Sequence, residues 1–199
     1  MLELQRQKNT PTAARSEGFT LIELMVVLAV LAALLLVAAP GLADLIRNNQ
    51  MVTDVYALRA TLNNARSEAI TRRAPVVVCP SSDGATCLAS NDWSNGYITF
   101  VAMNNNTAPD PNDPDEELIQ WEPRDRAMNI FYSNSEQQVI FNARGTALDY
   151  EGTFEFCDER GTEDARALIL NPVGSVSSAT DTDTNGIVND HGGADVTCS

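Results

Sequence analysis

The sequence predicts an α+β protein in which one long N-terminal helix packs on small antiparallel β-sheets. Three observations carry this prediction. Residues 24–43 are uncharged and mainly apolar, apolar residues then recur at helical spacing to about residue 73, and short β-type runs follow Pro75. Of the 199 residues 44% are hydrophobic and 20% charged, so the chain can bury a core and is neither disordered nor collagen-like.

The first 18 residues form a polar leader with a small positive excess, since three basic residues oppose two acidic ones. Such a bias keeps this end in the cytoplasm. An ordinary secretory signal would place its cleavage site among the small residues 37–39. Pro40 directly after that site and Glu23 at the head of the apolar run argue against this alternative.

Residues 19–43 are predicted to form a transmembrane or filament-core helix. The run 24–43 contains 20 residues without a charge, and a helix of that length covers about 30 Å, the thickness of a bilayer's hydrocarbon core. Pro40-Gly41 near its end predicts a bend or a partly melted turn. Glu23 is expensive in such a segment and therefore needs a partner.

The sequence GFTLIEL at residues 18–24, followed by this apolar run, resembles the type III signal of type IV pilins and of the pseudopilins of type II secretion. The resemblance implies that prepilin peptidase cleaves after Gly18 and that the new N-terminus, Phe19, is N-methylated. It also implies that Glu23 pairs with the terminal amine of a neighbouring subunit during assembly. That pairing would neutralise a carboxylate inside an apolar filament core.

Residues 44–74 are predicted to form an amphipathic helix that ends before Pro75. Six apolar positions recur at spacings of 4, 3, 4, 3 and 4 residues, while polar residues fill the other faces. They are Met51, Val55, Leu58, Leu62, Ala65 and Ala69. We interpret this stripe as plain core packing against a sheet.

The remaining residues, 75–199, are predicted to form a β-rich globular head with an acidic C-terminal tail. Short runs of β-forming residues alternate with turn residues. The predicted strands are 76–79, 97–103, 118–121, 128–132, 138–142, 153–157 and 167–171. The Pro-rich and acidic stretch 104–117 has no apolar period and is predicted to be a solvated loop.

Four head segments narrow the resemblance to the GspH/FimT family of minor pilins and pseudopilins: ARSEAITRRAPVVVCPSSDGATC, WSNGYITF, FCDERG and ARALILNPVG. The resemblance implies a type IV pilin-like fold. It also implies a structural minor pilin, anchored by one helix in the bacterial inner membrane with its head in the periplasm, that assembles at or near the tip of a type IV pilus and primes its assembly. The alternative is a GspH-type minor pseudopilin of the type II secretion system.

The same resemblance names the expected partners: prepilin peptidase, the inner membrane, the major pilin, and other minor pilins or pseudopilins. No enzymatic activity is expected. The sole histidine lies in the Gly-rich tail, and no nucleophile motif such as G-x-S-x-G occurs.

The four cysteines, Cys79, Cys87, Cys157 and Cys198, all lie in the segment expected outside the cytoplasm, where disulfides persist. Three pairings are possible. Cys79 with Cys87 encloses the turn-rich PSSDGAT and is the natural local pair, which would leave Cys157 with Cys198. The connectivity stays open at this stage. Zinc is not expected, because C-x7-C is not a ligand spacing.

One tail segment carries the start of an EF-hand-type calcium loop. Oxygen ligands at its first, third, fifth and seventh positions would come from Asp181, Asp183, Asn185 and Ile187, with glycine at the sixth position. The twelfth position is Gly192 where a calcium loop needs Glu. We expect no cofactor, and calcium is the one metal that the sequence leaves open.

Nucleic acid is not an expected partner. Residues 47–199 hold 10 Arg against 23 acidic residues, whereas DNA binding rests on many cations that neutralise phosphates. Some relatives in the family bind DNA through a G-R-x-R pattern, but the matching place here reads Gly174-Ser175-Val176-Ser177. The other head arginines considered, Arg124, Arg126, Arg144, Arg160 and Arg166, are scattered among acids and predict weak surface ion pairs.

Overall fold

The computed structural model describes residues 18–102, 117–124 and 128–198, apart from the side chains of residues 37–40. Contacts divide the chain into two compact units, Met1–Ile46 and Arg47–Ser199. One helix, α1 (Leu21–Arg72), contributes to both units and is 52 residues long. Pro40 does not end this helix, which continues through residues 37–40. The predicted solvated loop 104–117 lies outside the described residues except for Glu117, which starts a strand.

In the second unit, α1 buries one stripe of side chains. All six apolar positions of the predicted stripe are buried, five of them completely and Val55 to 8% exposure. The helix ends at Arg72, three residues before Pro75, as predicted. Arg73 then takes a left-handed backbone conformation with φ of 56°, the conformation that commonly closes a helix.

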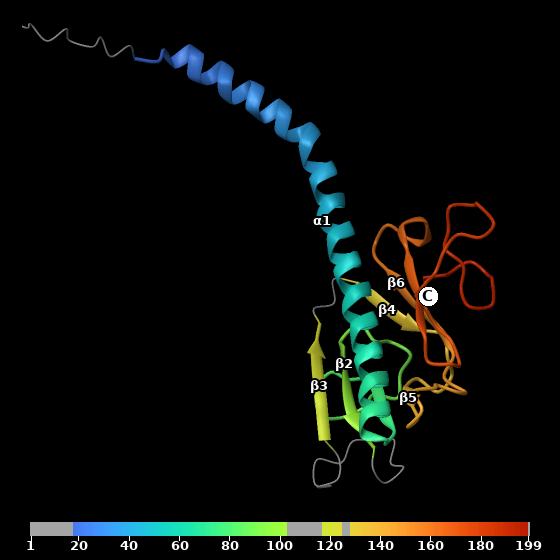
Figure 1. Ribbon diagram of the computed structural model, residues 1–199. Coiled ribbons are helices and arrows are strands. Elements are labelled where there is room, and N and C mark those ends of the chain that lie inside the picture. The colour runs from blue at the N-terminus through green and yellow to red at the C-terminus, as the bar shows by residue number, and fades with distance from the viewer. Residues whose placement is uncertain (1–17, 103–116, 125–127, 199) are drawn as a thin grey trace, which may run out of the picture. The chain divides into compact units, whose positions relative to one another are not determined.

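The first sheet has four antiparallel strands in the order β3-β2-β1-β5. These are β1 (Val76–Pro80), β2 (Gly96–Val101), β3 (Glu117–Pro123) and β5 (Val139–Phe141). The central strand β1 pairs with both β2 and β5, so that Val76 lies opposite Val101 on one side and Phe141 on the other. Figure 1 shows β2 and β3 beside the C-terminal half of α1.

The second sheet is also antiparallel, in the order β4-β6-β7-β8. Its strands are β4 (Asn129–Tyr132), β6 (Gly152–Cys157), β7 (Arg166–Leu170) and β8 (Val176–Ser178), and a short 3-10 helix, η1 (Thr162–Asp164), precedes β7. All seven predicted strands are confirmed within a few residues. The sequence missed β8, which has only three residues, two of them exposed serines.

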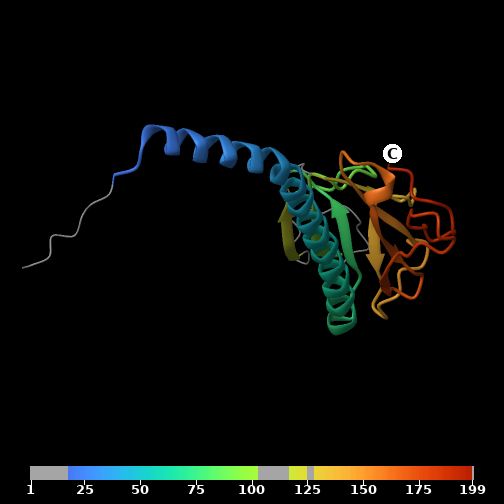
Figure 2. The same cartoon turned by 90° about the horizontal axis from the view of Figure 1, so that it is seen from above.

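Both sheets share one core with the second half of α1. Figure 2 shows strands of the head beside this half of the helix. An aromatic cluster lies within it: the Tyr132 and Phe154 rings stack with centroids 4.1 Å apart, and Trp93 meets Phe154 edge-on at 5.0 Å. Offset stacked and edge-on pairs are the favoured geometries of aromatic rings. The predicted α+β architecture is therefore confirmed: one long helix and two small antiparallel sheets.

Candidate assembly site

The N-terminal end of α1 carries the three residues that the sequence singled out for processing and assembly. Phe19 is 86% exposed, and the ideal Cβ position of Gly18 has no atom within 4 Å, so the predicted cleavage point lies in open backbone. The helix begins two residues after Phe19, at Leu21. The exposed Glu23 lies in the first turn, where the helix dipole favours a negative charge.

The pattern Thr-x-x-Glu at Thr20–Glu23 is a helix-capping sequence that the sequence analysis passed over. The backbone N–H of Glu23 donates to Thr20 Oγ1 at 3.2 Å, and the N–H of Leu24 donates to the Thr20 carbonyl oxygen at 3.2 Å. The first bond satisfies a helix donor that otherwise has no intrahelical partner, and the second is the first regular hydrogen bond of the helix. Thr20 therefore fixes where the helix starts, only two residues after the predicted cleavage point.

The first unit of α1 is apolar on all sides, and its large side chains are exposed. The exposed fractions between Leu21 and Ile46 run from 49% for Leu31 to 80% for Leu36. A helix that is apolar all round is normally buried in a membrane or an assembly. Among the described residues, no single helix is long and apolar enough to cross a membrane, although Leu21–Leu36 and Gly41–Arg72 could do so together as a bent pair.

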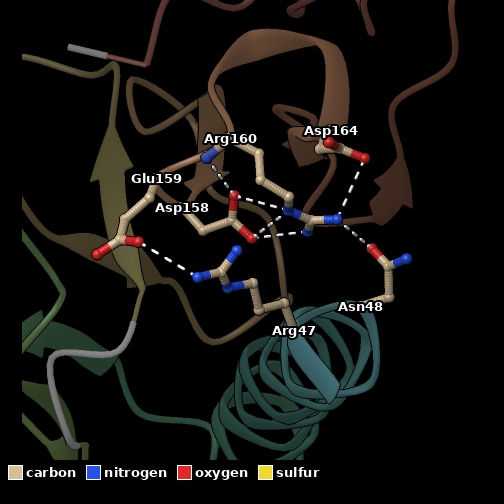
Figure 3. A network of polar contacts seen from close by, with 6 residues as sticks. All are labelled: Arg47, Asn48, Asp158, Glu159, Arg160 and Asp164. Atoms are coloured by element: carbon tan, nitrogen blue, oxygen red, sulfur yellow. Dashed lines mark hydrogen bonds and ion pairs between the residues drawn. The ribbon is translucent and has the colours of Figure 1, made fainter. Parts of the chain in front are cut away.

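A polar network fastens the start of the second unit of α1 to the segment after β6 (Figure 3). The Arg160 guanidinium donates to both carboxylate oxygens of Asp158, at 2.6 Å to 3.1 Å, and to Asn48 Oδ1 at 2.9 Å. Its Nη1 also lies 3.3 Å from Asp164 Oδ1. These hydrogen bonds from Arg160 hold the pKa of Asp158 below its usual range. The sequence predicted only a weak surface ion pair for Arg160, but the Arg160 side chain is only 14% exposed.

Farther along α1, Arg66 ties the helix to two turns. Its Nε donates to the carbonyl oxygen of Gly145 at 2.9 Å and its Nη2 donates to that of Val173 at 3.1 Å. Gly145 and Gly174 have φ of 76° and 78°, a region that favours glycine. A Cβ on Gly174 would lie 2.0 Å from the Gly145 oxygen. The Gly174-Ser175-Val176-Ser177 segment, compared above with a DNA-binding pattern, thus leads from the last residue of a tight turn into β8.

Each sheet has a second, outer layer that a disulfide fastens. Cys79 bonds to Cys87, and both belong to an apolar cluster on the outer face of the first sheet. Within that loop Asp83 accepts the N–H groups of Ala85 and Thr86, both at 2.9 Å, and these bonds hold the pKa of Asp83 well below its usual range. These hydrogen bonds therefore give the loop a defined conformation.

The C-terminal tail covers the outer face of the second sheet through three alternate residues of β6. Thr153 Oγ1 accepts the N–H of His191 at 2.9 Å, and Glu155 accepts the N–H groups of two tail residues, including Cys198 at 3.3 Å. Cys157 bonds covalently to Cys198. Side chains two residues apart lie on one face of a strand. Residues 153, 155 and 157 therefore share the outer face of β6, and each of them binds the tail.

The tail segment compared with a calcium loop is ordered by its own hydrogen bonds. Asp181 accepts the N–H groups of Thr184 at 2.7 Å and Gly186 at 2.8 Å. The amide nitrogen of Asn185 lies between two carboxylates, 3.0 Å from Asp183 Oδ2 and 2.9 Å from Asp195 Oδ2. Among the described residues, no three His, Cys, Asp or Glu side chains are grouped so as to hold a metal ion. These contacts do not test calcium binding, which the sequence leaves open.

An N-terminal helix that is apolar on all sides before residue 47 and amphipathic after it, followed by two small antiparallel sheets, defines a type IV pilin-like protein. Comparison with family models agrees with this class. Residues 54–174 match the model described as type II transport protein GspH, and residues 14–39 match the prokaryotic N-terminal methylation motif. The chain therefore belongs to the GspH family.

A search of solved structures supports the fold. The crystal structure of the type IV minor pilin FimU from Pseudomonas aeruginosa aligns with a TM-score of 0.52 at 21% identity, covering 66% of this chain and 90% of that one. A second crystal form of FimU aligns with a TM-score of 0.48 at 21% identity, covering 63% and 89%. No curated protein matches the chain.

Proposed function

We propose that this protein is a structural minor pilin, anchored in the bacterial inner membrane by α1 with its head in the periplasm, that assembles at or near the tip of a type IV pilus and primes its assembly. One observation carries the proposal: the first unit of α1, most of which lies within the methylation motif, exposes large apolar side chains on every side ahead of a folded head. Such a helix needs a membrane before assembly and neighbouring stems after it.

Prepilin peptidase, the major pilin and other minor subunits are the partners that this role requires. Gly18 lies in exposed backbone ahead of the capped helix, which suits cleavage at that point. Cleavage would leave the amine of Phe19 four residues before the Glu23 carboxylate. An amine at a helix N-terminus is disfavoured by the helix dipole, so a carboxylate from a neighbouring subunit would stabilise it.

Substitutions at Glu23 test the pairing. Glu23→Gln keeps the size and helical tendency of the side chain but removes its charge, whereas Glu23→Asp keeps the charge. We expect Glu23→Gln to be cleaved and to remain in the membrane, yet to be lost from sheared filaments, with Glu23→Asp retaining part of the incorporation. Normal incorporation of Glu23→Gln would contradict the pairing. Gly18→Phe should instead accumulate as uncut precursor.

The second candidate is a minor pseudopilin of the type II secretion system, and the match of residues 54–174 to the type II transport protein GspH family supports it. Deletion of the gene separates the two roles. Loss of surface pili with normal secretion of exported proteins supports the pilus, and the reverse result supports secretion. A role in DNA uptake is a weaker candidate, because serines occupy positions 175 and 177 where DNA-binding relatives carry Arg.

A further inference from the structure

The second unit of α1 and the residue after it carry a stripe of positive charge whose members are partly or fully exposed. Its positions within the helix each lie one residue, or about 100° around the helix, beyond the buried stripe, and its last residue follows the helix end. We call it the arginine stripe; it comprises Tyr56, Arg59, Asn63, Arg66, Ile70 and Arg73. Arg59 and Arg66 are seven residues apart, about 10 Å along the helix axis, and Arg73 directly follows the last helical residue. Tyr56 and Ile70 are 64% and 48% exposed, so aromatic and apolar surface separates the charges.

The two flanks of the same helix differ in whether their charged side chains form ion pairs. On the flank toward the first sheet, Asp54 pairs with the buried Arg124, and Arg72 pairs with Glu68 and Glu117. In the described part of the chain, no carboxylate forms an ion pair with Arg59, Arg66 or Arg73. The only polar bonds of the Arg66 guanidinium among these residues go to neutral carbonyl oxygens.

The turn that Arg66 holds extends the stripe sideways. An ideal Cβ on Gly145 would lie 2.6 Å from Ile70 Cδ1 and 3.2 Å from Arg66 Cγ, so this turn lies directly against the stripe. The exposed Arg144 precedes Gly145 and likewise forms no ion pair with a described residue. Val173, which accepts from Arg66, is 60% exposed. The surface therefore combines four arginines with exposed apolar side chains.

Arg73 adds a second indication. Its φ of 56° puts it in the left-handed region, where a residue with a side chain is less favourable than glycine by about 1 kcal/mol. The chain thus carries a cation at a helix end where glycine would be the more stable choice.

We propose that the arginine stripe docks a carboxylate-bearing surface of a neighbouring pilin-family subunit. The inference rests on the proposed function, because assembly is what brings that subunit to α1. Arg and Tyr are the residues that contribute most at protein interfaces. The head itself carries 23 acidic residues against 10 Arg, so a similar acidic subunit would offer complementary charge. A head-to-tail contact between unlike surfaces also generates a helical series, as a filament requires.

A protein fits this surface better than a nucleic acid does. A compact set of carboxylates interacts only with charges within about one Debye length, roughly 8 Å at physiological salt. A long polyanion would instead meet the whole head, with a formal charge of 10 − 23 = −13 over residues 47–199, and be repelled. The exposed Tyr56 and Ile70 provide area that a protein partner can bury.

Charge reversals in the full-length chain test the proposal. Each pilin-family subunit encoded beside this gene is co-expressed with the tagged chain, and its recovery is measured from detergent-solubilised membranes at low and high salt. We expect Arg59→Glu, Arg73→Glu and Arg144→Glu each to reduce the recovery of at least one subunit about tenfold at low salt. High salt should produce a similar loss with the unaltered chain. Arg66 is left intact because it holds two turns.

Two controls separate docking from folding. Arg166→Glu changes the net charge equally at an exposed position on β7 and should leave recovery unchanged. Arg73→Gly removes the cation while relieving the left-handed strain, so the head should be at least as stable as before while recovery falls about threefold. Its thermal unfolding, measured by tryptophan fluorescence, checks this.

Equal recovery for every reversal would overturn the inference while leaving the proposed function intact. If the unaltered chain recovers no filament subunit and is absent from sheared filaments, the proposed function fails as well. Salt-sensitive binding of a 30-base-pair DNA duplex that the same reversals abolish would also overturn the inference, because the stripe would then bind a nucleic acid.

Discussion

The two units of α1 are continuous helix but differ in what surrounds them. Before residue 47 large apolar side chains are exposed on every side, whereas after it one stripe is completely or almost completely buried by the two sheets. The two units share the same helical backbone hydrogen bonding and are distinguished by the surroundings of their side chains. The second unit finds its apolar partners within its own chain, and the first must find them in a membrane or in other subunits.

This difference extends to polar side chains. In the second unit, Arg66, Asn48 and Asp54 each bond to a residue far along the chain in the head. In the first unit, the side-chain bond described for the helix start joins Thr20 to Glu23, three residues apart. Head stability should thus depend on residues after 46, whereas residues before 47 should matter for membrane retention and stem packing and not for the stability of the head.

The largest expected effect comes from placing the same charge in each unit. Leu62→Asp places a carboxylate at a completely buried position among apolar side chains. It should destabilise the head by more than about 4 kcal/mol, enough to unfold it. Leu28→Asp should leave unfolding of the head unchanged but weaken retention in the membrane. The buried Trp93 reports unfolding by fluorescence, and fractionation reports retention. Unfolding of the head by Leu28→Asp would break the comparison.

Next in size is the loss of the tail's covalent attachment. The Cys157–Cys198 bridge spans 41 residues, and on the chain-entropy model its removal costs about 4 kcal/mol, against about 2.5 kcal/mol for the shorter bridge. Cys198→Ser should therefore lower the unfolding temperature more than Cys87→Ser. Neither should alter cleavage after Gly18. A larger loss for Cys87→Ser would show that bridge length does not set the order.

The sequence predicts the elements of this molecule better than the contacts between them. Helix periodicity identified all six residues of the buried stripe, because burial on one face imposes a 3.6-residue period. Helix periodicity did not show that Arg66 links the helix to two turns of the head. The partners of Arg66 are the carbonyl oxygens of Gly145 and Val173, 79 and 107 residues away. Backbone acceptors have no residue-type signature.

Two further features are visible in the sequence. The Thr-x-x-Glu pattern at Thr20 precedes an apolar run, which is a recognised helix-start signal. The heptad spacing of Arg59, Arg66 and Arg73 is visible in the letters, but its lack of carboxylate partners needed coordinates. The strand β8 could not be predicted from its residues, since the tight turn at Asn171–Gly174, rather than strand propensity, brings it beside β7.

A substitution in that turn should have a moderate effect on the head. Gly174→Ala places a methyl group 2.0 Å from the Gly145 oxygen at a positive φ and should cost about 2 kcal/mol or more. Gly161→Ala is the matched control, because its φ is also positive but no atom lies within 4 Å of the added Cβ. The difference between their unfolding free energies isolates the clash. Equal losses would show that backbone strain alone matters.

The smallest expected effect concerns calcium in the tail. The Asn185 amide already joins the carboxylates of Asp183 and Asp195, and Asp181 is engaged by backbone N–H groups. A cation would have to displace these bonds, and the bidentate Glu of a calcium loop is replaced by Gly192. Millimolar calcium should therefore shift the unfolding temperature of the full-length chain by less than about 1 °C relative to EGTA, since a ligand stabilises only in proportion to its occupancy. A rise of several degrees that Asp181→Asn abolishes would instead establish a calcium site in the head.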